Sequence, residues 1–137
     1  MDGATIVFCT VCTDDRIPWC ASEEVMKHLH EIWLCEAVAW QVGQYLFMPD
    51  HIHFFASPLA SCSVSIERWT SFWKDRLSKR CKREDWRWQR GVFHHRMRSE
   101  EELREQELYV LNNPVKMGLV AHPADWPLQG RVHPLRW

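Results

Sequence analysis

The stretch VGQYLFMPDHIHFFAS, residues 42–57, contains two short apolar runs on either side of Pro49-Asp50. Proline fixes its own φ angle and aspartate readily adopts turn conformations, so this dipeptide predicts a tight turn. The runs Val42 to Met48 and His51 to Ser57 therefore predict a hairpin, or two strands joined closely. Such a hairpin needs neighbouring elements to cover its apolar side chains.

Regular elements are predicted on both sides of this hairpin. A first strand is indicated over Thr5 to Thr13, where β-branched residues and cysteine occur without a helical period. The helical period returns over Ser65 to Leu77, and Trp86 to Arg98 is expected to be extended. Ser22, followed by two acidic residues, predicts the start of a capped amphipathic helix. Its apolar positions are Val25, Leu29, Ile32 and Trp33.

The last predicted helix has the clearest start in the sequence. Ser99 and Glu102 form a capping box, in which the hydroxyl and the carboxylate are expected to satisfy opposite backbone amides. Pro114 disfavours helical geometry at the preceding residue, so Asn113 is expected in or just past the final turn of this helix, with its amide free to reach a ligand. The prolines after Gly118 exclude a long regular element in the tail.

The order strand, helix, strand, strand, helix, strand, helix determines the predicted fold class. It is an α+β fold with a ferredoxin-like split βαβ antiparallel sheet, helices on one face, and an added C-terminal helix that carries Tyr109. No linker or internal repeat divides the chain. We therefore expect a single domain over residues 1–137.

Composition excludes several classes of protein. A chain of 137 residues with 46% hydrophobic and 26% charged residues can bury a core of its own and is not disordered. It shows no export signal or membrane span, so a cytoplasmic location is expected. Its six cysteines are then expected to be reduced. Only Cys9 and Cys12 form a C-x-x-C, with no second pair to complete a zinc site. No phosphate-binding loop or dinucleotide fingerprint indicates a nucleotide cofactor.

Charge is distributed unevenly although the net charge is only −1. Residues 67–98 carry eleven basic and four acidic residues and lie between acidic flanks. This segment can meet DNA phosphates, or it can be a solvated helix face. Trp86 and Trp88 are candidates for stacking on unpaired bases, whereas Trp69 and Trp73 have the spacing of core residues. The candidate phosphate contacts are Arg68, Lys74, Arg76, Lys79, Arg80, Lys82, Arg83, Arg87 and Arg90.

His51 and His53 form a candidate pair of metal ligands. Side chains alternate along a strand, so both imidazoles are expected on one face and Ile52 on the other. Asp50 precedes the pair and can orient a ligand or cap the turn. Such pairs are also found as half-exposed strand residues without a metal, and both interpretations remain open at this point.

Tyr109 and Asn113 are four residues apart in the last predicted helix. That spacing places them on one helix face, and Tyr109 lies well away from the apolar stripe. An exposed phenol is available for chemistry, and the Asn113 amide can reach a ligand. The alternative is a surface tyrosine followed by an asparagine that ends the helix.

Three separated motifs together resemble the REP-associated tyrosine transposases, which are single-tyrosine HUH transposases of bacteria. They occur in the family's order and spacing, and the resemblance extends from about Thr5 to Trp126. The motifs are MPDHIH at 48–53, WQRGVFHHRMRS at 88–99 and YVLNNPVKMGLV at 109–120.

The resemblance implies a role for each candidate residue. His51 and His53 correspond to the histidines that hold a divalent metal, Mg²⁺ or Mn²⁺, and Asn113 to a third ligand. Tyr109 corresponds to the nucleophile that attacks a phosphodiester. The basic segment is then expected to bind single-stranded or hairpin DNA, and the protein is expected to form a homodimer.

The activity implied by the resemblance is metal-dependent cleavage of single-stranded DNA and strand transfer through a 5'-phosphotyrosine. Two alternatives remain open at the level of the sequence. One is a non-catalytic module that binds hairpin DNA as a regulatory or architectural protein. The other is a metal-dependent hydrolase of a small phosphoester, in which water replaces Tyr109.

Overall fold

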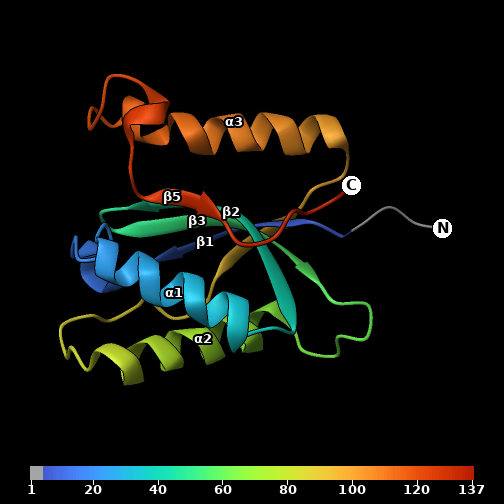
Figure 1. The fold of residues 1–137 in the computed structure, drawn as a ribbon, viewed down its shortest axis with the longest axis horizontal. Helices are drawn as coiled ribbons and strands as arrows, with labels where there is room; N and C mark the ends of the chain where they lie inside the picture. Colours follow the sequence, from blue (N-terminus) through green and yellow to red (C-terminus); the bar gives the residue numbers. More distant parts are fainter. Residues whose placement is uncertain (1–4) are drawn as a thin grey trace.

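The computed structural model describes residues 5–137 and contains a five-stranded antiparallel sheet. The strand order is β4-β1-β3-β2-β5, and β2 and β3 form the hairpin that turns at Pro49-Asp50. The first four strands have the ferredoxin-like arrangement, so the predicted fold class is confirmed (Figure 1). The strands are β1 (Val7–Cys12), β2 (Trp40–Met48), β3 (His51–Pro58), β4 (Phe93–Arg96) and β5 (Gln129–Arg131).

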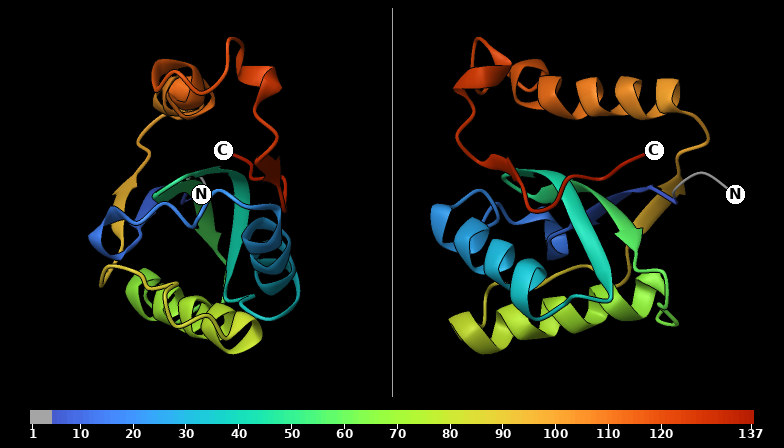
Figure 2. Two further views of the ribbon diagram at one scale, coloured as in Figure 1. Left: turned by 90° about the vertical axis from the view of Figure 1, so that its left-hand side faces the viewer. Right: turned by 45° about the vertical axis from the view of Figure 1, so that its right-hand side comes forward.

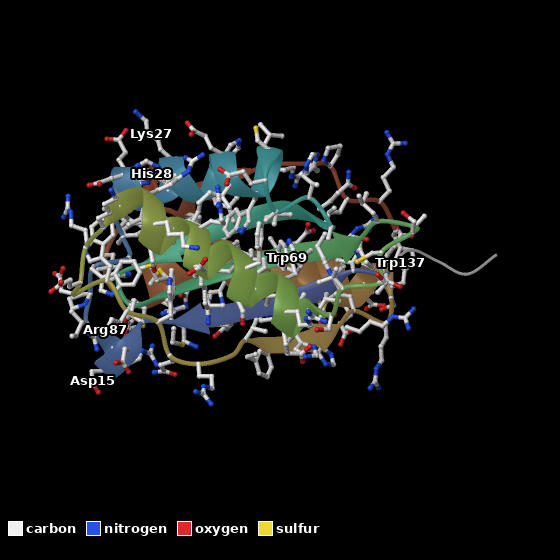
Figure 3. The ribbon with its side chains drawn as sticks, turned by 90° about the horizontal axis from the view of Figure 1, so that it is seen from below. Asp15, Lys27, His28, Trp69, Arg87 and Trp137 are labelled. Atoms are coloured by element: carbon white, nitrogen blue, oxygen red, sulfur yellow. The ribbon has the colours of Figure 1, made fainter. Side chains whose placement is uncertain are left out.

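The helices lie in two layers on opposite faces of the sheet. α1 (Glu23–Cys35) and α2 (Ile66–Cys81) cover one face, and α3 (Glu100–Lys116) lies alone across the other (Figures 1 and 2). Seen from the α1 and α2 side, the two helices lie next to each other over the strands (Figure 3). None of the helices within residues 5–137 has the length and apolar character that a bilayer crossing requires.

The larger core fills the space between the sheet and the helices α1 and α2. Trp33, Trp69 and Trp73 are fully buried there and pack against each other and against Phe54. The predicted core role of Trp69 and Trp73 is therefore confirmed. A smaller apolar cluster joins α3 to the other face of the sheet, through residues such as Phe8, Phe55 and Val110.

The N-terminal caps form at the predicted serines. The hydroxyls of Ser22 and Ser99 accept hydrogen bonds from the amides of Val25 and Glu102, at 3.1 and 3.0 Å. The capping box of α3 differs in one detail: the Glu102 carboxylate accepts from the amide of Arg98, one residue before the cap.

Two boundaries differ from the prediction. The extended segment shrinks to β4, because residues 86–92 form an irregular loop that pairs only through an isolated bridge between Trp88 and Thr13, the residue after β1. The tail adds the short strand β5 beside β2. Helix α3 ends at Lys116, so Asn113 lies in its final turn as expected, but Pro114 is inside the helix and both residues are buried. Burial of this last turn offsets the missing amide of the proline, which local preference could not anticipate.

Replacing Ser99 by Ala is expected to destabilise the protein by about 1 kcal/mol, because the first turn of α3 loses its cap. Chemical denaturation would measure the change. Ser78→Ala is the matched control, because its hydroxyl donates to the Lys74 carbonyl inside α2 and caps no helix. An equal loss in both variants would contradict a specific capping role.

Candidate active site

The two histidines lie on the strand face that α3 covers. Ile52 points into the opposite core, as the alternation predicts. The ring centroids of His51 and His53 are 4.6 Å apart, and His53 is only 7% exposed. The sheet therefore holds the two imidazoles side by side in a largely water-excluded position.

Each histidine is oriented through its Nδ1 atom. Nδ1 of His51 lies 2.8 Å from a carboxylate oxygen of Asp50, whose other oxygen accepts from Arg16 Nε at 2.9 Å. Nδ1 of His53 lies 2.9 Å from the hydroxyl of Thr10 on β1. A carboxylate only accepts, so the Nδ1 of His51 carries the proton. Both rings thus have Nδ1 engaged and Nε2 available, the arrangement typical of metal-binding histidines with supporting partners.

The electrostatics of this pair depends on burial. Burial and the nearby His51 lower the pKa of His53 to about 3, so its imidazole is neutral at neutral pH. Partial burial acts to raise the pKa of Asp50, but its hydrogen bonds with Arg16 and His51 outweigh burial and lower the pKa. His53 is therefore in the neutral state that a metal ligand needs, and the Asp50 carboxylate that bonds His51 is ionised.

The pKa of His53 predicts a pH dependence of stability. In the unfolded chain His53 titrates near 6.5, so below that pH the unfolded state binds more protons than the folded state. The free energy of unfolding therefore decreases as the pH falls from 6.5 toward 3. Between pH 6.5 and 5 the loss should be up to about 2 kcal/mol. Urea denaturation in EDTA would measure it, and His53→Gln should lose correspondingly less; identical pH profiles would contradict the assignment.

Tyr109 lies on α3 beside the histidines. Its ring centroid is 6.2 Å from that of His53, and the side chain is 47% exposed, as expected for a residue off the apolar stripe. Lys116 places its ammonium 5.7 Å from the Tyr109 ring. A cleft of about 620 Å³ contains both Tyr109 and His53 on its walls. The phenol is thus open to a ligand and next to the buried imidazole within one chain.

Asn113 is buried rather than free at a helix end. It is 7% exposed, and its side-chain oxygen Oδ1 has no hydrogen-bond partner within the described residues. A buried carbonyl without a partner costs free energy unless a ligand satisfies it. It follows Val110 by three residues and so faces the sheet as Val110 does. Two imidazole nitrogens and this oxygen are a donor set that fits a divalent cation.

The part of the basic segment in α2 lies on the other side of the sheet, and four of the nine candidate phosphate contacts are in ion pairs: Arg76, Lys79, Arg80 and Arg83. Arg76 and Arg80 bind Glu36 at 2.8 and 2.7 Å, and Arg83 binds Glu24 at 3.1 Å. Acidic residues from the first third of the chain thus neutralise part of the positive middle third. Charge counts along the sequence did not indicate this pairing. The structure does not bring these arginines next to Tyr109.

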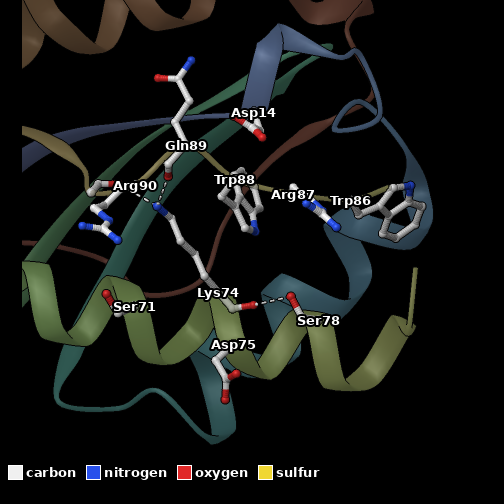
Figure 4. Close-up of a pocket in the computed structure, with 11 residues that line it drawn as sticks. Asp14, Ser71, Lys74, Asp75, Ser78, Trp86, Arg87, Trp88, Gln89 and Arg90 are labelled. Carbon is white, nitrogen blue, oxygen red and sulfur yellow. Dashed lines mark hydrogen bonds between the residues drawn. The ribbon is translucent and has the colours of Figure 1, made fainter. Parts of the chain in front are cut away.

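Trp86 and Trp88 border a second pocket, of about 460 Å³, between α2 and the loop at residues 86–91 (Figure 4). Both indoles already have aromatic partners: each packs against Trp19, with centroids 5.3 and 4.7 Å away. Lys74 donates to two loop carbonyls, and burial lowers its pKa to about 8. These side chains hold the loop on α2, so stacking on a base would require them to rearrange.

One group with metal-ligand chemistry was not anticipated. Glu24, His28 and Cys81 bring three possible ligand atoms within 4.8 Å of one another, and they are the only such group of acids, histidines and cysteines in residues 5–137. No local motif indicates this group, because Glu24 and His28 belong to α1 and Cys81 belongs to α2. Arg83 binds Glu24, and Arg80 lies 3.2 Å from His28 Nδ1, so arginines already engage two of the three.

The candidate site thus consists of two histidines on a strand of a ferredoxin-like sheet, beneath a helix that carries a tyrosine. A structure of a REP-associated tyrosine transposase bound to a REP hairpin matches with a TM-score of 0.77 and 21% identity, covering 99% of this chain and 86% of that one. A crystal structure of a "putative transposase" from Deinococcus radiodurans matches with a TM-score of 0.54 and 14% identity, covering 82% and 92%.

Sequence comparison finds a relative in the group that the motifs resemble. A Haemophilus influenzae protein named "Putative REP-associated tyrosine transposase" is 25% identical in an alignment over 122 residues. The match covers 75% of this chain and 69% of that protein. No family model matches the chain. The resemblance to the REP-associated tyrosine transposases predicted from the motifs is therefore confirmed.

Proposed function

We propose that this protein cleaves single-stranded DNA in hairpin-bearing substrates and transfers the cut strand through a covalent 5'-phosphotyrosine at Tyr109. The observation that carries the proposal is the contact between the exposed phenol of Tyr109 and the buried, neutral imidazole of His53. The structural relative is described as bound to a REP hairpin, which supports hairpin DNA as the substrate.

The proposed reaction assigns one task to each group. The Tyr109 oxygen attacks phosphorus, the bond to the 3'-oxygen breaks, and that oxygen leaves with a proton, so that a 5'-phosphate remains on the tyrosine. His51, His53 and Asn113 would hold Mg²⁺ or Mn²⁺. When bound, the metal supplies Lewis-acid polarisation of the phosphate, which a weak neutral nucleophile such as phenol needs. Thr10 and Asp50 keep the two imidazoles in position.

The experiment that tests this proposal detects the covalent product. Hairpins from the DNA flanking the gene are labelled at the 3' end, because the 5'-phosphotyrosine retains the downstream strand. They are incubated with the protein in Mn²⁺ or in EDTA and then denatured. A labelled protein band that forms only with Mn²⁺ is the expected result. Binding in a native gel without any adduct would instead support the hairpin-binding module.

The alternative hydrolase is tested with a chromogenic phosphodiester. The cleft is open enough for a small ester, so turnover of this compound with no DNA adduct would favour water as the nucleophile. We expect no such turnover, because DNA contacts outside the cleft are needed to hold the scissile bond in line with Tyr109.

The homodimer expected from the resemblance remains a proposal. It is not needed to complete the candidate site, because His53 and Tyr109 contact each other within one chain. Sedimentation of the protein with and without hairpin DNA would measure the oligomeric state.

Asp50→Ala is expected to weaken Mn²⁺ binding by about 10- to 100-fold, because the His51 ring loses the partner that fixes its orientation. Asp50→Asn retains an acceptor oxygen and should lose less. Electron paramagnetic resonance of free Mn²⁺ would measure both affinities, with Asp75→Ala as the control for a lost surface charge. Equal affinities in Asp50→Ala and the wild type would contradict the positioning role.

A further inference from the structure

The cleft beside Tyr109 has two unlike walls. One wall comes from the sheet and presents the aromatic rings of Phe8 and Phe93, whose centroids are 6.4 Å apart. The other comes from α3 and presents the polar side chains of Glu102, Glu105 and Gln106. The sheet wall also carries Thr10, His53 and His95, so the cleft offers an apolar patch at Phe8 and Phe93 facing the hydrogen-bonding groups of α3, next to the proposed nucleophile.

The charge of the cleft indicates what can enter it. Within residues 5–137 no lysine or arginine lines this cleft, and two of its lining residues are carboxylates, Glu102 and Glu105. A phosphate group would be repelled from this wall. The part of a DNA strand that suits the wall at Glu102 and Glu105 is an uncharged, flat base, while the scissile phosphate stays beside Tyr109 and His53, which also line the cleft.

Phe93 has the properties of a stacking platform. Its side chain is 61% exposed on the edge strand β4, although it is a large apolar ring on a structured element. Aromatic faces bind unpaired bases in a sequence-tolerant manner. A base seated on Phe93 would remove this ring from water.

The opposite wall adds a chemical preference. Glu102 is already bonded to His95 and to the Arg98 amide, which leaves Glu105 and Gln106 to meet a ligand. A carboxylate accepts hydrogen bonds and donates none, so it suits the exocyclic amino group of cytosine and not the carbonyl oxygen that thymine carries at that position.

We propose that the cleft between β4 and α3 binds one unpaired, amino-bearing base next to the scissile phosphodiester, stacked on Phe93 and held at its edge by Glu105. The inference rests on the proposed function for the presence of a DNA strand at Tyr109. It adds a specificity site at Phe93 and Glu105, in the same cleft as the candidate metal ligand His53.

The test measures binding of fluorescein-labelled eight-residue oligodeoxycytidine and oligodeoxythymidine by anisotropy, in EDTA so that no cleavage occurs. The wild type should bind the cytidine strand about 5- to 30-fold more tightly. Phe93→Ala should weaken that binding by a similar factor, and Phe93→Trp should restore it. Glu105→Gln should reduce the preference between the two strands, because an amide can also donate to thymine.

Two control variants match these changes elsewhere on the molecule. Val38→Ala removes an exposed apolar side chain outside the cleft, and Glu101→Gln removes the same charge from α3 without lining the cleft. Both should leave binding unchanged. Equal binding of the two strands by the wild type would overturn the proposal, as would a preference that survives in both Phe93→Ala and Glu105→Gln.

Failure of this inference is distinguishable from failure of the proposed function. A covalent adduct with no strand preference would overturn the base-binding cleft and leave strand transfer in place. A strand preference that depends on Phe93, with no adduct in Mn²⁺, would support the cleft in a protein that binds DNA without cutting it.

Discussion

Tyr109→Phe is expected to abolish the covalent protein–DNA adduct, by more than about a thousandfold, and to leave hairpin binding within about twofold. The substitution removes one oxygen atom from a side chain that is 47% exposed, so the fold has little reason to change. We expect hairpin binding to depend on contacts with phosphates and bases elsewhere, which loss of this hydroxyl leaves in place. Gel detection of labelled protein after denaturation measures the first effect, and a native gel in EDTA measures the second.

The chain provides its own control for this experiment. It contains only two tyrosines, and the other, Tyr45, is buried on the α1 side of the sheet, where its hydroxyl bonds His30. Burial also raises the pKa of Tyr45, which makes it a poorer nucleophile. Tyr45→Phe should therefore retain the adduct. An adduct that persists in Tyr109→Phe and disappears in Tyr45→Phe would reverse the assignment.

Features set by neighbouring residues could be predicted from the sequence. The turn at Pro49-Asp50, the strand alternation that places His51 and His53 on one face, and the serine caps each depend on a few consecutive side chains. Local chemistry decides such features, because a cap or a turn satisfies its hydrogen bonds within a few residues.

Features that join distant segments could not be predicted in the same way. Thr10 meets His53 across 43 positions of sequence, and Arg80 pairs with the acidic residues of α1, so its charge is not free for DNA. The side of the sheet on which α3 packs is also a tertiary property. It determines that Tyr109 lies beside His53, while the paired arginines of α2 lie on the opposite face of the sheet.

The helical state of Asn113 shows how burial overrides local preference. The proline that follows it disfavours a helix, yet the chain continues as α3 for one more turn, and the side chain becomes buried. Its side-chain amide, expected to be free at the helix end, is instead fixed in the interior, and its Oδ1 has no hydrogen-bond partner within residues 5–137. Local sequence could suggest the residue but not its burial, and burial is what makes its oxygen a candidate ligand.

Asn113→Ala is expected to weaken Mn²⁺ binding and adduct formation while leaving the free energy of unfolding nearly unchanged. Removal of an unsatisfied buried carbonyl should change the free energy of unfolding by no more than about 1 kcal/mol, because no hydrogen bond of that oxygen is lost. Mn²⁺ affinity should fall by about 10- to 100-fold, and adduct formation should fall with it. Urea denaturation and Mn²⁺ resonance titration measure the two effects on the same samples.

Its neighbour supplies the matched control. Asn112 donates to the Leu108 carbonyl from the exposed side of α3, so Asn112→Ala should leave Mn²⁺ binding unchanged. Asn113→Asp keeps an oxygen at the buried position and should bind Mn²⁺ while losing stability in EDTA, because an unpaired carboxylate is then buried. Loss of stability in Asn113→Ala with full Mn²⁺ affinity would identify Asn113 as a structural residue of the last turn, and the third ligand would have to be sought in the DNA itself.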